Sequence, residues 1–258
     1  MTPQLIGGLA LTGIVGASLG LLGAGGSIIM LPVLVYVVGV EPHAAVPLSL
    51  AVIGTTSLVG VAVRSTGSEI DWRTALIFGG AALGGSYLGS RLTALVPGSV
   101  LLLSFGLLLV VVGLRMWREA VASTDPARTH RRPSLMLAAG SGVGVLTGFL
   151  GVGGGFLIVP ALTRVGGLSM RQAIATSLVV ITMSSGAGLA AHLAHGNSVP
   201  VGLALALTTA ALVGMAAGMQ GARHVSSENL RRGFAGFVTG VGSALIILNT
   251  PSALRLLK

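Results

Sequence analysis

Long apolar stretches separated by short polar connections run through the whole chain. Most of the charge-free stretches are close to the roughly 20 residues that a helix needs to cross the hydrocarbon core of a bilayer. The pattern predicts an all-α fold, a polytopic transmembrane bundle of about 8 to 10 hydrophobic segments. The segments lie at about 4–22, 28–39, 44–63, 74–94 and 99–117, then at about 134–150, 156–166, 171–193, 199–222 and 233–250.

Composition agrees with this pattern. The 258 residues are 53% hydrophobic and only 8% charged, whereas about 25% of the residues of an ordinary soluble domain are charged. Cysteine is absent, which excludes disulfides, iron–sulfur clusters and thiolate metal sites. We therefore expect a multi-pass membrane protein, in contact with lipid and without a cofactor.

The formal net charge of +9 raises the question of nucleic acid. The basic residues form no continuous basic helix face and are not interleaved with stacking aromatics, so we expect no nucleic-acid partner. They lie between apolar segments, and the densest cluster spans residues 115–133. By the positive-inside rule this loop is cytoplasmic. We predict a first membrane repeat at 1–117, a basic cytoplasmic linker at 118–133 and a second repeat at 134–258.

The chain is internally duplicated. A shift of 128 residues places GLLGAGGSIIMLP (residues 20–32) on GFLGVGGGFLIVP (residues 148–160), with six of thirteen positions identical. The same shift places AVPLSL (45–50) on AIATSL (173–178). Five crossings per half would make the two halves inverted repeats, as in many transporters. With inverted repeats, Arg255 and Lys258 would face outward, against the positive-inside rule. Whether the short second segment of each half is re-entrant or spans the membrane stays open.

Adjacent glycines interrupt both copies of the repeated motif. Each glycine in a helix interior costs about 1 kcal/mol relative to alanine, so both helices should break there. The helix that follows a break presents free N–H groups and a positive dipole end to an anion. The alternative is close helix packing, which we prefer for the separate glycine runs near 79, 84 and 214. As substrate-binding candidates the motif gives Gly23, Gly25, Gly26 and Ser27, with Gly151, Gly153, Gly154 and Gly155 in the second copy.

Hydroxyl and cationic side chains follow each break. We favour Ser49 and Ser177 as donors to an oxyanion, although membrane serines also bond to their own helix carbonyls. The other hydroxyls of these runs are Thr55, Thr56, Ser57, Thr176, Thr182, Ser184 and Ser185. Arg64 and His192 occupy equivalent positions and are candidates for charge or proton coupling, the alternative being interfacial snorkelling.

Other chemistry has little support. His192 and His195 have helical spacing for a metal but lack a third ligand, so we predict no metal site. Nothing in the apolar segments combines a nucleophile with a base, so we expect no enzyme and no catalytic residue. A carboxylate relay within the segments is also missing, which disfavours a cation transporter.

The paired motifs, followed by AVPLSLAVI and AIATSLVVI, resemble those of the sulfite exporter TauE/SafE family of membrane permeases. The resemblance implies export, or less often import, of small sulfur-containing or organic anions such as sulfite, sulfoacetate or thiosulfate across a bacterial inner membrane. The first copy has Ser27 where the second has Gly155, so the halves need not contribute equally. We expect a secondary transporter of a small anion that works by alternating access. A permease for another organic anion, a non-transporting membrane scaffold and a homo-oligomer remain alternatives.

Overall fold

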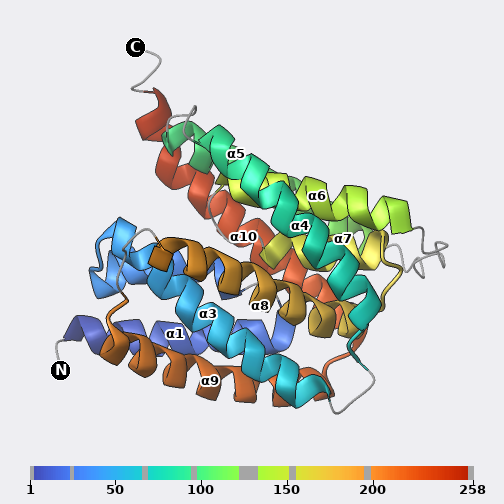
Figure 1. Ribbon diagram of the computed structural model, residues 1–258, viewed down its shortest axis with the longest axis horizontal. Coiled ribbons are helices and arrows are strands. Elements are labelled where there is room, and N and C mark those ends of the chain that lie inside the picture. Colours follow the sequence, from blue (N-terminus) through green and yellow to red (C-terminus); the bar gives the residue numbers. More distant parts are fainter. Residues whose placement is uncertain are drawn as a thin grey trace.

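The computed structural model describes residues 3–23, 26–65, 69–93, 98–121, 133–150, 155–194 and 199–254. All regular elements in these ranges are helices, which confirms the all-α prediction (Figure 1). The first half contains α1 (Pro3–Leu22), α2 (Gly26–Pro32), the π-helix η1 (Val33–Val38), α3 (Pro42–Ser65), α4 (Trp72–Thr93) and α5 (Gly98–Val121). The second contains α6 (Pro133–Leu150), α7 (Gly155–Arg164), α8 (Met170–Ala194), α9 (Val201–His224) and α10 (Ser227–Leu254).

Four helices are long and apolar enough to cross a membrane within the described ranges. They are Gln4–Leu22, Ala44–Ser65, Met170–Ala194 and Val201–Ala222. The helix bounds agree with the predicted segments, and the largest differences are at the end of α5 and at both ends of α10. Helix α5 continues to Val121, four residues into the predicted linker, and its last turn contains Arg118.

Each half contributes one helix to two parallel pairs, α1 with α9 and α4 with α6. Figure 1 shows α1 and α9 side by side along one edge of the bundle. Gly16 and Gly144 are equivalent under the 128-residue shift, and both permit close approach of the paired helices. A Cβ atom at Gly16 would overlap the carbonyl oxygen of Ala211, and one at Gly144 would overlap that of Ala82. The halves therefore interlock through equivalent contacts.

Equivalent helices run antiparallel in the middle of the bundle. Leu50 of α3 packs on Gly188 of α8, and Leu178 of α8 packs on Gly60 of α3. The 128-residue shift converts the first of these contacts into the second, which is the signature of a local twofold axis between α3 and α8. Helices α5 and α10 are also antiparallel, because Gly106 lies beside Ile246 whereas Gly113 lies beside Ala235.

The short second segment of the first half folds back along α1. Gly8 of α1 packs on Val38 at the end of η1, so α2 and η1 return to the level at which α1 begins. Gly39 then ends the segment with a φ of 78°, and the Val40 N–H donates to Leu34 O at 2.9 Å. The second half ends its short helix in the same way. Gly167 has a φ of 61°, and the Leu168 N–H donates to Leu162 O at 3.3 Å. Such left-handed C-caps favour glycine.

One end of the bundle collects the described arginines. It contains the ends of α3, α5, α7 and α9 and the starts of α4, α8 and α10, and we call it the arginine-rich end. Arg171 Nη2 donates to Val225 O at 2.9 Å and the Asp71 N–H donates to Thr176 Oγ1 at 3.1 Å, which ties these termini together. Of the ten arginines in the described residues, Arg91 alone lies toward the opposite end. The others are Arg64, Arg73, Arg115, Arg118, Arg164, Arg171, Arg223, Arg231 and Arg232.

Candidate functional site

The first glycine break lies where the sequence predicts it. Helix α1 ends at Leu22 and α2 begins at Gly26. Gly23 has a φ of 77°, and its N–H donates to Leu19 O at 2.9 Å. A Cβ atom on Gly23 would lie 2.7 Å from Ser177 Oγ and 3.0 Å from the Ile174 Cα. The break of the first half therefore abuts α8 of the second half.

The other candidates in the glycine motifs have different surroundings. Gly26 is buried against α1, since a Cβ atom there would overlap Val15 O and lie 3.3 Å from Leu19 Cβ. Ser27 is half-buried in α2, and Gly155 is the first residue of α7. Close packing is thus one reason for glycine at position 26. The candidates Gly25, Gly151, Gly153 and Gly154 lie outside the described residues.

Ser49 and Ser177 make equivalent hydrogen bonds to their own helices. Ser49 Oγ donates to Val46 O at 2.9 Å, and Ser177 Oγ donates to Ile174 O at 2.8 Å. These are the local bonds that membrane serines commonly form. A hydroxyl that bonds in this way must rotate before it can donate to an anion.

The antiparallel register keeps these two serines apart. Ser49 precedes Leu50, which packs on Gly188, and Ser177 precedes Leu178, which packs on Gly60. The two contacts are ten residues apart on α3, or about 15 Å along the helix axis at 1.5 Å per residue. Ser49 and Ser177 therefore lie toward opposite ends of the α3–α8 pair and do not contact one small anion together.

Arg64 is bound at the end of α1. Its Nη2 donates to Gly20 O and its Nη1 to Glu69 Oε2, both at 2.9 Å, and its side chain is 12% exposed. The Gly20 carbonyl belongs to the last turn of α1, where a cation also interacts favourably with the helix dipole. Arg64 thus stabilises the helix end that immediately precedes the break.

His192 lies in the last turn of α8 and is half-buried there. This is the end of α8 opposite to Ser177, so His192 and Arg64 belong to different ends of the bundle. His195 lies outside the described residues. Within the described ranges, no three His, Cys, Asp or Glu side chains are grouped in a way that could hold a metal ion.

The buried polar side chains of the described residues are all hydroxyls. They are Thr12, Thr56, Ser57, Thr74, Thr176, Ser177, Ser185 and Thr208. Ser57 Oγ and Thr12 Oγ1 are buried and have no hydrogen-bond partner in the described part of the chain. The sequence contains the signal for Ser57, because the 128-residue shift places it on Ser185 within the hydroxyl-rich runs. Burial and the missing hydrogen bond depend on the tertiary structure.

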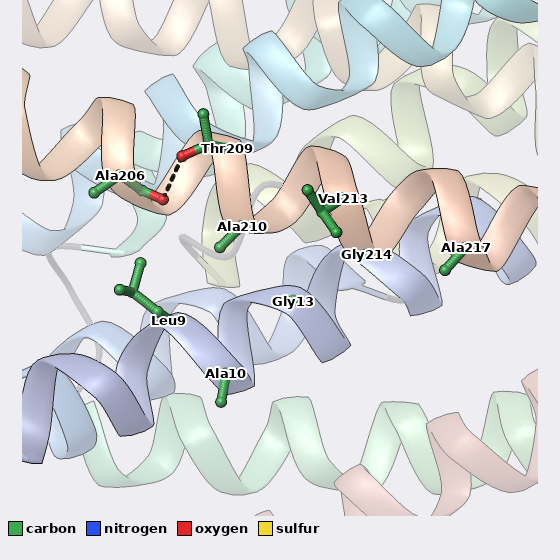
Figure 2. Close-up of a pocket in the computed structure, with 9 residues that line it drawn as sticks. All are labelled: Leu9, Ala10, Gly13, Ala206, Thr209, Ala210, Val213, Gly214 and Ala217. Carbon is green, nitrogen blue, oxygen red and sulfur yellow. Dashed lines mark hydrogen bonds between the residues drawn. The ribbon is translucent and has the colours of Figure 1, made fainter.

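An apolar groove lies on the outer side of the α1–α9 pair, away from the predicted site residues (Figure 2). Its volume is about 510 Å³. The one polar side chain in its lining is Thr209, whose Oγ1 donates to Ala206 O at 2.8 Å, as Figure 2 shows. The groove is lined by Leu9, Ala10, Gly13, Ala206, Thr209, Ala210, Val213, Gly214 and Ala217. A surface of this kind is suited to contact with lipid tails and offers little to an anion.

Comparison with known proteins places the chain in a family. The sequence model described as sulfite exporter TauE/SafE matches residues 8–245. The chain belongs to this family. A probable membrane transporter protein of Xylella fastidiosa (strain 9a5c) is 41% identical over 174 residues, which cover 66% of each chain, just under two thirds of that relative. The probable membrane transporter protein YdhB of Bacillus subtilis is 30% identical over 68% of this chain and 74% of its own length.

The likeness extends to archaea. The probable membrane transporter protein MJ0441 of Methanocaldococcus jannaschii is 26% identical over 75% of this chain and 78% of its own. No solved structure matches the chain. Family membership and the apolar helices identify a multi-pass membrane protein of a permease family.

Proposed function

We propose that this permease carries a small anion, either sulfite or a related sulfur oxyanion or organosulfonate, by alternating access across a bacterial inner membrane. The observation that carries the proposal is the chemistry of the interior. Every buried polar side chain in the described ranges is a hydroxyl, and none is a carboxylate. Hydroxyls can donate hydrogen bonds to an anion, whereas intramembrane cation sites use carboxylates.

The arrangement of the halves supports alternating access. Equivalent helices run antiparallel in the α3–α8 and α5–α10 pairs. We infer that the halves are inverted repeats related by an axis in the membrane plane. Transporters of this architecture move one repeat against the other around a site at the repeat interface.

Charge supports an orientation. The arginine-rich end carries nine of the ten described arginines, and the positive-inside rule assigns such an end to the cytoplasm. The N-terminal end of α1 then faces the other side of the membrane. An excess of positive charge at the cytoplasmic mouth also raises the local concentration of anions there, which suits an exporter.

The glycine break supports a moving contact between the halves. Gly23 is packed directly on Ser177, so a rearrangement of the halves changes the surroundings of the break. The positive dipole end of α2 lies next to this contact, which favours an anion there. In this proposal Gly23, Gly25, Gly26 and Ser27 and their counterparts Gly151, Gly153, Gly154 and Gly155 line the moving part of the pathway.

Transport by the purified protein in proteoliposomes tests the proposal. Vesicles loaded with sulfite, thiosulfate, sulfoacetate or acetate should release at least one of these anions faster than empty liposomes do. Competition among the four would separate a sulfur oxyanion carrier from a permease for another organic anion. If the protein moves none of them, the anion proposal is wrong and a scaffold becomes the better interpretation.

A pair of variants tests the role of the breaks. Gly25→Leu and Gly153→Leu should abolish flux while leaving the protein folded. Gly84→Leu is the matched control, because Gly84 is exposed on α4 and nothing lies within 4 Å of a Cβ atom there. Flux at the wild-type rate in all three variants would leave the break glycines with a packing role only.

A further inference from the structure

We propose that the transported anion binds at the centre of the α3–α8 contact, where Ser57 and its equivalent Ser185 donate hydrogen bonds to its oxygens. The inference rests on the proposed function and moves the main anion contacts from Ser49 and Ser177 to a second pair of serines. It also makes the local twofold axis the place where the two halves share one ligand.

The register of α3 against α8 defines this centre. Three contacts follow one another along α3, where Leu50 meets Gly188, Gly54 meets Ser185 and Gly60 meets Leu178. In each contact the two residue numbers sum to 238 or 239, and equivalent residues of the two helices differ by 128. Residue 55 of α3 therefore lies opposite its own equivalent on α8, and the twofold axis passes near it. This level is halfway between the contacts of Leu50 and Leu178, hence near the middle of the bundle.

Ser57 faces α8 at this level. It is three residues from Gly54 and three from Gly60, which places it about 60° around the helix from each, between two residues that both face α8. Its Oγ is fully buried, and it has no hydrogen-bond partner in the described residues. Buried hydroxyls are nearly always hydrogen-bonded, so this one calls for a reason. A ligand that accepts a hydrogen bond provides it.

Ser185 occupies the equivalent position on α8. It is 4% exposed, and a Cβ atom on Gly54 would lie 3.0 Å from Ser185 Cβ. Glycine at position 54 therefore lets Ser185 come close to the backbone of α3. Two serines related by the axis thus converge from opposite helices, as a ligand bound on that axis requires.

The neighbouring hydroxyls serve their own helices. Thr56 Oγ1 donates to Val52 O at 2.6 Å, and Thr182 Oγ1 donates to Leu178 O at 2.8 Å. Ser57 differs from them and from Ser49 and Ser177 because no such bond occupies its hydroxyl. The Ser57 hydroxyl is therefore available as a donor without rotation away from a carbonyl.

The chemistry fits a small oxyanion that must leave again. No carboxylate is buried in the described ranges, so nothing at the site repels negative charge. Two neutral hydroxyls give a weak site, and conduction requires binding that is weak enough for release. Because α3 and α8 are in contact at Gly54 and Ser185, the site is closed in this arrangement, and the anion enters when the two helices separate.

Flux kinetics in proteoliposomes test the site. Ser57→Ala and Ser185→Ala should each raise the KM for sulfite by about tenfold or more, the loss expected for one hydrogen bond to a charged group. The matched control is Ser18→Ala on α1, whose KM should change less than about twofold because the Ser18 hydroxyl donates to Val15 O at 2.8 Å. Thiosulfate replaces sulfite as the probe if the wild-type chain carries only thiosulfate.

A labelling experiment decides the case in which an alanine variant fails to fold. The chain contains no cysteine, so Ser57→Cys introduces a unique thiol. Sulfonatoethyl methanethiosulfonate should modify it, and sulfoacetate, which does not react with the reagent, should slow the modification in a concentration-dependent way. Ser65→Cys is the control, since Ser65 is exposed at the end of α3 and sulfoacetate should not protect it.

The outcomes distinguish the two proposals. If wild-type vesicles carry none of the four anions, both the anion function and this site are overturned. If they carry one of them while Ser57→Ala and Ser185→Ala leave the KM unchanged, only the site is overturned. Protection of the Ser57→Cys thiol by sulfoacetate supports the site, and modification that sulfoacetate does not affect contradicts it.

Discussion

Gly23 and Ser177 form a contact in which the end of a helix from one half of the chain lies directly on a helix from the other half. The contact needs glycine for two separate reasons. The φ of 77° at Gly23 is unfavourable for a residue with a side chain, and a Cβ atom there would lie 2.7 Å from Ser177 Oγ. The repeated glycine motif is therefore also a contact between the halves.

Alanine at position 23 should destabilise the protein more than alanine at another glycine with the same backbone conformation. Gly39 is the matched control, because its φ is 78° and nothing lies within 4 Å of a Cβ atom. Gly39→Ala should cost about 1 kcal/mol from backbone strain alone, and Gly23→Ala about 2–4 kcal/mol because steric overlap is added. Thermal unfolding of the purified variants in detergent measures the order. Equal Tm values for the two variants would show that the contact with Ser177 is not tight.

Replacement of Arg64 should lower the stability of the protein, and a loss of flux should follow from that loss of stability. Arg64→Ala removes the donor to Gly20 O in the last turn of α1, and we expect a cost of about 1–3 kcal/mol. Glu69→Gln should cost less than about 1 kcal/mol, because the Glu69 side chain is 42% exposed and exposed ion pairs contribute little. Tm and flux are measured on the same preparations. A variant with wild-type Tm but no flux would instead assign Arg64 the charge-coupling role that the sequence suggests.

A disulfide between α3 and α8 should form and should stop transport. The Cβ of Ser185 is 3.0 Å from a Cβ built on Gly54, which is shorter than the roughly 3.5–4.5 Å of a disulfide, so a small outward shift of the two helices brings the pair into range. Gly54→Cys with Ser185→Cys should therefore cross-link on mild oxidation, and flux should return when reductant is added. The control pair combines Gly54→Cys with Ser177→Cys, two helical turns away on α8. Cross-linking of the control pair alone would refute the register, whereas flux through the cross-linked protein would refute movement between these helices.

Single cysteines should report the orientation of the bundle. Ser169 and Ser226 are exposed at the arginine-rich end, and Gly39 is exposed at the opposite end. In intact cells a membrane-impermeant thiol reagent should label Gly39→Cys and leave Ser169→Cys and Ser226→Cys unlabelled until the membrane is opened. The reverse pattern would place the arginines outside and contradict the positive-inside assignment.

Much of the fold could be predicted because it depends on local properties. The apolar segments predict the helices to within a few residues in most cases, and the glycine motif predicts the interruption between Leu22 and Gly26. The repeat also contained a signal that was missed, since the 128-residue shift places Gly39 on Gly167, and both have a positive φ at the end of a short helix. A glycine two or three residues before a polar connection is a recognisable C-cap signal.

The choice of Ser49 and Ser177 shows where sequence reasoning reached its limit. Both were selected because they are duplicated and follow the breaks, yet each hydroxyl bonds to a carbonyl of its own helix. The levels of the two serines are also about 15 Å apart along the α3–α8 pair. Ser57 and Ser185 are duplicated in the same way, so the sequence alone could not rank the two pairs. The ranking that we propose follows from the missing hydrogen bond of Ser57 and from the antiparallel register.

The sequence by itself determined that this is a membrane permease built from two equivalent halves, because hydropathy and self-similarity are properties of the chain. Only the tertiary structure decided that α1 pairs with α9, that α4 pairs with α6, and that α3 crosses its own equivalent antiparallel. The physical reason is that a membrane helix has apolar faces toward both lipid and protein, which look alike in sequence. Partners are then selected by close backbone approach at glycines such as Gly16, Gly23 and Gly54, whose neighbours lie in the other half of the chain.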